Sequence, residues 1–154
     1  MENIVGVLKG AKQATDLVYD LFFGEKRAIA AIVLHFSDLS DIYDKYNSWT
    51  LIFGDMPVRD QIRRLSLRLV AERRRTFKNK TLDEILTFHS ANMNIDYDRV
   101  TSVTVKKGIL SAYMEFVVDS DLKRKMNFLI GKDQLLEAIN LGEKLFPTKM
   151  KAQV

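Results

Sequence analysis

The sequence predicts a single α+β domain, in which an antiparallel barrel or strongly bent sheet carries an inserted helical hairpin and a closing C-terminal helix. Three observations predict this fold. Residues 4–34 have the pattern of strands, residues 37–91 switch to helical spacing, and residues 95–146 return to strands before a final helix. The chain has 154 residues, 47% of them hydrophobic, which suits one domain with a packed core. We expect the domain to span residues 1–150 and the tail 151–154 to be frayed.

Residues 4–34 are predicted to form two or three strands. In the segment LVYDLFF at residues 17–23, side chains that favour strands alternate between two faces. Gly24, Glu25 and Lys26 form a tight turn, and the apolar run resumes after it. A helix over residues 14–22 is the competing interpretation, because charged side chains at four-residue spacing would then share one face. The pattern leaves this choice open.

Residues 37–91 are predicted to be helical. A short helix begins near Ser37 and Asp38 and ends near residue 47, and an apolar loop or broken helix follows it. Pro57 suits the first turn of a longer helix. The sequence TLDE from Thr81 is a capping box that begins another short helix, which ends near residue 90. The longer helix has an apolar stripe at steps of four, three and four residues, formed by Val58, Ile62, Leu65 and Leu69.

Residues 95–130 are predicted to form a three-stranded antiparallel meander. The first strand continues from Ile95 through Val105, with an irregularity near residues 98–100. A turn at residues 106–108 leads into the second strand. In the second strand, Leu110, Ala112, Met114, Phe116 and Val118 alternate with the residues between them, and in the third strand the alternation predicts one buried face, formed by Met126, Phe128 and Ile130.

The final helix is predicted to follow the third strand directly. Asp133 is placed at its cap, and Pro147 lies just past its end. Its apolar positions include Leu135, Leu136, Ile139 and Leu145.

Two motifs resemble those of a known family. LFFGEKRAI at residues 21–29 is similar to a hairpin in which an apolar strand meets a turn and a Lys-Arg pair, and IDYDRVTSV at residues 95–103 is similar to a strand with an I-x-Y-x-x-I pattern. Together with KKG at residues 106–108 and the closing amphipathic helix, they resemble a pleckstrin-homology-like (PH-like) domain of the bacterial PH or GRAM-like kind. The arrangement is also similar to that of uncharacterised archaeal proteins.

The resemblance covers residues 4–34 and 93–146 and leaves residues 37–91 as a helical insertion. It implies the fold but no particular binding residue, because no binding motif of the family matches here. Some such domains bind anionic lipids, and others only contact proteins or assemble.

No pattern of catalytic or metal-binding residues is found in the sequence. The absence of cysteine excludes disulfides, thiolate metal sites and cysteine nucleophiles. His35 and His89 lie in no metal-binding spacing, so we interpret them as structural or surface residues. The acids Asp38, Asp41 and Asp44 lack the glycine and terminal glutamate of a calcium loop. We therefore expect no enzymatic activity, no metal and no cofactor.

The long helix is strongly basic. The segment from Met56 to Lys80, which contains the predicted basic helix Arg59–Lys80, carries nine basic and two acidic residues, a net charge of 9 − 2 = +7, so the rest of the chain carries 4 − 7 = −3. A helical wheel places Arg63, Arg74 and Lys78 opposite the apolar stripe and places Arg64, Arg68 and Arg75 along one flank, with Leu67 among them. These six basic residues are the candidates for binding an anion, because arginine suits phosphate contacts. The nine basic residues are Arg59, Arg63, Arg64, Arg68, Arg73, Arg74, Arg75, Lys78 and Lys80.

Several functions are compatible with this helix. The plainest interpretation is a solvated face, paired with acids around Asp38 or with another subunit. We expect a non-catalytic binding or assembly module that associates with itself or another protein through the insertion. Peripheral binding to anionic lipid is the alternative, and nucleic acid is a distant third possibility. The candidate apolar contacts are Trp49, Leu51, Ile52, Phe53 and Leu67.

The expected location is the cytoplasm, with peripheral attachment to a membrane as the alternative. The longest apolar run, residues 28–34, has seven residues, whereas a membrane-spanning helix needs about 20. No signal peptide is recognisable at the N-terminus.

Overall fold

The computed structural model describes residues 2–40, 56–119 and 124–154, and it confirms the α+β class. The helices are α3 (Met56–Phe77), α4 (Leu82–Thr87) and α5 (Leu135–Leu145). Short 3-10 helices cover Phe36–Leu39, Tyr97–Arg99 and Lys132–Gln134. The strands are β1 (Gly6–Ala14), β2 (Leu17–Phe23), β3 (Arg27–Leu34), β4 (Met93–Asp96), β5 (Val100–Lys107), β6 (Ala112–Val118), β7 (Arg124–Ile130) and β8 (Met150–Gln153).

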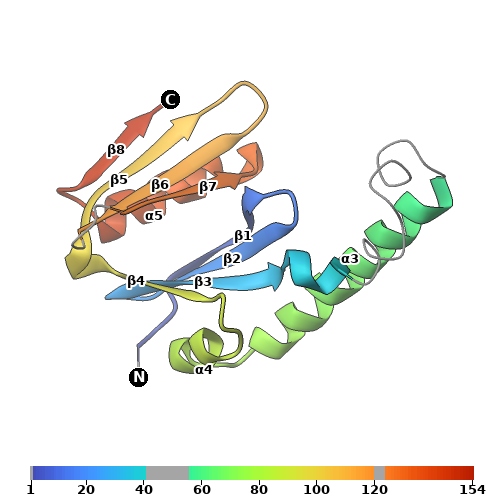
Figure 1. The fold of residues 1–154 in the computed structure, drawn as a ribbon. Helices are drawn as coiled ribbons and strands as arrows, with labels where there is room; N and C mark the ends of the chain where they lie inside the picture. The colour runs from blue at the N-terminus through green and yellow to red at the C-terminus, as the bar shows by residue number, and fades with distance from the viewer. Residues whose placement is uncertain (1, 41–55, 120–123) are drawn as a thin grey trace.

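The eight strands form one sheet in the order β4-β3-β2-β1-β7-β6-β5-β8. Two antiparallel groups, β1 to β4 and β5 to β7, meet where Lys12 of β1 pairs with Leu129 of β7. Figure 1 shows these groups as two layers, with α5 behind one of them and α3 and α4 beside the other. The edges β4 and β8 do not pair with each other, so the sheet of the described residues is open and the closed barrel is not seen.

The structure decides two predictions about strands, one for residues 17–23 and one for residues 95–105. Residues 17–23 form β2 and pair with both β1 and β3, so the competing helix over residues 14–22 is wrong. The predicted strand from Ile95 to Val105 is in fact two strands. The 3-10 turn Tyr97–Arg99 separates them, because β4 pairs with β3 whereas β5 pairs with β6 and β8.

The main core lies between the two layers of the sheet and α5. Phe116 of β6 is fully buried at its centre, with ring centroids 6.4 Å from Phe23, 6.2 Å from Phe128 and 6.1 Å from Phe146. These rings come from β2, β7 and the end of α5, so one hydrophobic cluster joins both strand groups.

A second hydrophobic cluster covers the opposite face of β2 and β3. Ile29, Ala31 and Val33 pack there against Phe77 of α3 and against α4. Because the alternate residues of β3 belong to the main core, this strand is buried on both faces. That explains its continuous apolar sequence.

The C-terminal tail corrects the prediction of a frayed end. Residues 150–153 form β8, which lies parallel to β5 with Met150 opposite Val103. Met150 also donates its backbone N–H to the carbonyl of Phe146, and its side chain packs over Gly142 of α5. The tail is ordered because β5 offers it an unpaired edge.

The start of the C-terminal helix also differs from the prediction. Asp133 lies inside the 3-10 turn Lys132–Gln134 and does not cap a helix. Gln134 occupies the cap position of α5, and instead of capping it, its side chain binds both the N–H and the carbonyl of Lys9 on β1.

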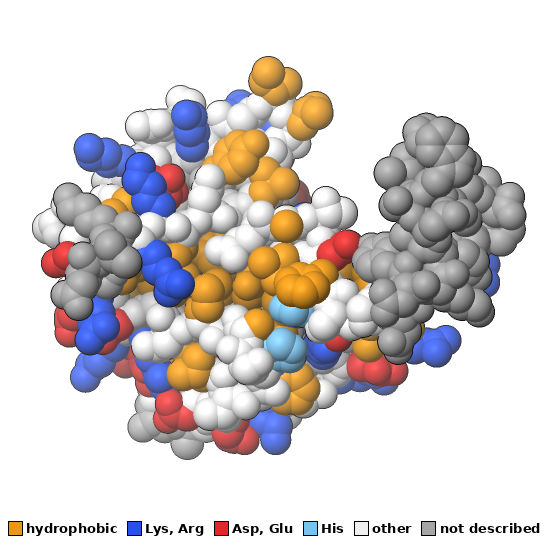
Figure 2. Space-filling view, viewed as in Figure 1, with side chains coloured by type: hydrophobic (Ala, Val, Ile, Leu, Met, Phe, Trp, Pro, Cys, Tyr) orange, Lys and Arg blue, Asp and Glu red, His pale blue; other side chains and the backbone are white. Residues whose placement is uncertain are grey.

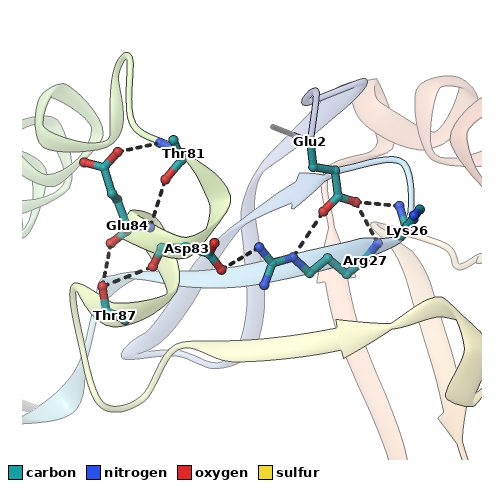
Figure 3. A network of polar contacts seen from close by, with 7 residues as sticks. All are labelled: Glu2, Lys26, Arg27, Thr81, Asp83, Glu84 and Thr87. Atoms are coloured by element: carbon teal, nitrogen blue, oxygen red, sulfur yellow. Dashed lines mark hydrogen bonds and ion pairs between the residues drawn. The ribbon is translucent and has the colours of Figure 1, made fainter.

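A polar network ties the N-terminus to the β2–β3 turn and to α4 (Figure 3). Glu2 accepts hydrogen bonds from the backbone N–H groups of Lys26 and Arg27 and from the Arg27 guanidinium. The same guanidinium reaches Asp83 at 2.7 Å, and this bond is the main reason the pKa of Arg27 is raised. The predicted capping box at Thr81 is confirmed, because Thr81 and Glu84 exchange both hydrogen bonds.

Candidate functional site

The C-terminal third of α3 is held to the sheet by a buried ion pair. Asp20 of β2 is 1% exposed, and both of its carboxylate oxygens accept hydrogen bonds from Arg74, at 2.7 and 2.8 Å. Oδ1, the oxygen 2.8 Å from Arg74, also accepts a hydrogen bond from the backbone N–H of Gly10 at 2.9 Å. Gly10 has φ +72°, a conformation that favours glycine, within an irregular stretch of β1. The bond to Asp20 raises the pKa of Arg74.

A second ion pair lies one residue earlier on the helix. Arg73 donates to both oxygens of Asp38 at 2.7 Å and also to the carbonyl of Val33. Asp38 in turn accepts the backbone N–H of His35 at 2.8 Å. Burial alone would raise the pKa of Asp38, but the hydrogen bonds from Arg73 and His35 outweigh it, and the pKa is lowered.

These pairs correct the helical-wheel placement of Arg74. The wheel puts Arg74 opposite the apolar stripe, whereas in the structure it faces the sheet and is only partly exposed. The reason is that the end of the helix packs through Val70 and Phe77 in addition to Leu69 of the stripe, so its buried side is turned away from the direction of Ile62 and Leu65. Arg74 is therefore paired with a protein carboxylate.

The rest of α3 extends past the strand ends, away from the sheet (Figure 1). Arg64 pairs with Asp60 one turn earlier, and Lys80, just after the helix, pairs with Glu84. Leu67 is 60% exposed among the basic side chains. Four exposed cations, Arg63, Arg68, Arg75 and Lys78, have no ion pair with any carboxylate that the structure describes. We call these four residues and Leu67 the outer face of α3; Lys78 lies in the turn directly after the helix.

His35 and His89 lie together, although the sequence separates them. Their ring centroids are 5.4 Å apart, and the His35 ring also stacks on Phe36 at 4.0 Å. The Nδ1 atom of His89 accepts the N–H of Ala91. Burial, reinforced by the charge of Arg73, lowers the pKa of His89. Within the described part of the chain, no group of three or more possible metal ligands is found.

The β5–β6 hairpin carries an apolar tip that the strand pattern missed. Ile109 and Leu110 are each 90% exposed, and Leu110, which the alternation includes in the second strand, lies outside it. The reason is that β6 begins only at Ala112, and the turn closes with a 2.7 Å hydrogen bond from the N–H of Gly108 to the carbonyl of Ser111. Figure 2 shows hydrophobic side chains protruding at this end of the hairpin.

Most of the apolar candidates lie outside the residues that the structure describes. Trp49, Leu51, Ile52 and Phe53 lie outside the described residues, as do Asp41 and Asp44. Of the apolar candidates, only Leu67 is described. Asp20, the partner of Arg74, is not among the predicted site residues, although a lone carboxylate inside an apolar strand is a signal for such a role.

Comparison of the chain with protein-family profiles, with curated proteins and with solved structures finds no match. In the part of the chain that the structure describes, no helix is long and apolar enough to cross a membrane.

Proposed function

We propose that the protein is a non-catalytic binding module of the PH-like kind, and that its outer face of α3 binds anionic lipid surfaces. One observation carries the proposal. Arg64, Arg73 and Arg74 are paired with protein carboxylates, whereas the four exposed cations of the outer face have no ion pair with a carboxylate of the described residues. A helix held at one end by two partly buried ion pairs presents these cations in a fixed arrangement.

The strand order supports the PH-like part of the proposal. An antiparallel group, β1 to β4, is followed by an antiparallel meander, β5 to β7, and then by α5. The helical insertion lies between β3 and β4, as the resemblance implies. The open sheet and the additional strand β8 depart from a simple PH-like barrel.

The charge of the outer face favours lipid over a second copy of the same helix. Each basic residue close to an anionic membrane contributes about 1 kcal/mol, so the four cations together would contribute about 4 kcal/mol. Two copies of α3 packed face to face would instead bring like charges together, which opposes a symmetric contact.

The test is a charge reversal with a matched control. We expect Arg63→Glu, Arg68→Glu and Arg75→Glu together to abolish co-sedimentation with vesicles that contain anionic lipid, at low salt. The control reverses three other exposed cations, Arg99, Arg124 and Lys125, and changes the net charge equally. If the two triple variants lose binding to the same extent, the outer face has no special role and the proposal is wrong.

Self-association through the insertion is the second candidate. The exposure of Leu67 and the half-buried positions of Ile62 and Leu65 favour it, since apolar side chains at a surface can pack against a partner. Light scattering on the isolated protein tests it, and a monomeric mass at micromolar concentration would remove this candidate.

A further inference from the structure

We propose that the tip of the β5–β6 hairpin, formed by Ile109 and Leu110, inserts into the interfacial region of an anionic bilayer. This inference rests on the proposed function for its choice of a bilayer as the partner. It concerns a different part of the molecule from the outer face of α3, and it can fail separately.

The geometry of the turn forces the two aliphatic side chains outward. Lys107 of β5 pairs with Ala112 of β6, so the residues between them form the loop. At Gly108 an added Cβ would lie 2.9 Å from the carbonyl oxygen of Ser111, so the tight turn requires a glycine. Ile109 and Leu110, each 90% exposed, therefore contact little of the protein.

The tip is unusual for a turn between strands. Such turns are built mostly from glycine, asparagine, aspartate, proline and serine, because these residues suit the backbone and the solvent. Two adjacent branched aliphatic side chains at the most exposed point leave apolar surface in water. Their burial in an apolar phase is favourable, and a bilayer interface offers one.

The charges next to the tip fit an anionic surface. Lys106 and Lys107 precede the turn and are exposed, and the loop itself contains no acidic residue. A third lysine, Lys132, donates its Nζ to the carbonyl of Ile109 from the start of the α5 segment. An apolar tip among lysines is the pattern of side chains that enter the interface while cations contact headgroups.

The small size of the tip distinguishes a bilayer from a protein partner. A stable protein interface buries about 800 Å² on each side, which requires many residues. Two side chains at the end of a narrow hairpin provide much less than that area. Insertion into lipid needs no complementary surface, so a small protruding tip is sufficient for it.

The absence of cysteine allows a direct test of insertion. A single Leu110→Cys variant is labelled with an environment-sensitive fluorophore and titrated with vesicles containing anionic lipid. We expect the emission to shift to the blue for the label at residue 110. The same label on Ser90→Cys, an exposed position after α4, should not shift. Equal emission changes at both positions, or none at residue 110, would overturn the inference.

A second experiment separates this inference from the proposed function. Ile109→Ser with Leu110→Ser should weaken vesicle partitioning at least about tenfold without changing the circular dichroism spectrum, since both side chains are exposed. If the serine pair binds like the wild type while the α3 triple variant does not bind, the tip inference fails and the proposed function stands. If the serine pair does not bind while the α3 triple variant binds like the wild type, the tip inference stands and the outer face of α3 has no role in binding. If the wild-type protein does not bind the vesicles at all, both proposals fail.

Discussion

Asp20 occupies a position where a charge is tolerated only because it is fully paired. The carboxylate accepts three hydrogen bonds, two from Arg74 and one from Gly10. A buried charge that loses its partner is strongly destabilising, whereas removing both charges of a pair is often nearly neutral. Arg74 therefore stabilises the fold by compensating Asp20 and by joining α3 to β2.

We expect Arg74→Met alone to lower the free energy of unfolding by about 3 kcal/mol, because it leaves the Asp20 carboxylate uncompensated. The double variant Asp20→Asn with Arg74→Met should lose only about 1 kcal/mol, since asparagine can still accept the N–H of Gly10 and carries no charge. Urea denaturation measures both values. A double variant that is less stable than Arg74→Met would contradict this account.

His89 makes stability depend on pH near neutrality. Its pKa is lowered by burial and by the charges of Arg73 and His35, which outweigh the opposing effect of Asp38. The unfolded chain, with a histidine pKa of about 6.5, therefore binds more protons than the native protein as the pH falls. The stability contributed by neutral His89 is present above this value and is lost as the pH falls toward the native pKa.

We expect the urea midpoint of the wild type to decrease between about pH 7.5 and pH 5.5 more than that of His89→Asn. Asparagine is the matched variant, because its side-chain oxygen can accept the N–H of Ala91, as Nδ1 of His89 does, but it does not titrate. Parallel pH profiles for the two proteins would show that His89 does not contribute to this dependence.

At the scale of elements, local signals in the sequence predicted most of the architecture. The alternation in β6 and β7, the turn at Gly24 and the capping box at Thr81 each depend on residues close together in the chain. The position of Pro57 in the first turn of α3 is another feature that depends only on local sequence. Such features follow from backbone and side-chain preferences alone, so one sequence is enough to find them.

The elements that sequence reasoning missed depend on partners far away in the chain. β8 has no apolar alternation and is a strand because β5 offers an edge. Arg74 turns inward because Asp20, 54 residues earlier, lies on β2. His35 meets His89 because the insertion brings α4 back to the end of β3. The exposed Leu110 was missed because alternation does not say where a hairpin turns.

At the scale of the whole molecule, the two strand groups pair with each other at only one described position of β1 and β7, but they share one large hydrophobic core. The two strand groups share one register pair there, yet Phe116 of one group packs against Phe23 of the other. The hydrophobic cluster also includes the end of α5. Packing of side chains, more than hydrogen bonding between strands, therefore joins the two groups.

The two groups should consequently unfold together. We expect Phe116→Ala to cost about 3–5 kcal/mol, because it removes a fully buried aromatic ring. Phe88→Ala, the same change at a half-exposed ring, should cost clearly less. In native-state hydrogen exchange, Phe116→Ala should lower the protection of slowly exchanging amides in β2 and β6 by the same free energy, although the residue lies on β6. If β6 lost protection while β2 kept it, the groups would unfold as separate units and the shared core would not couple them.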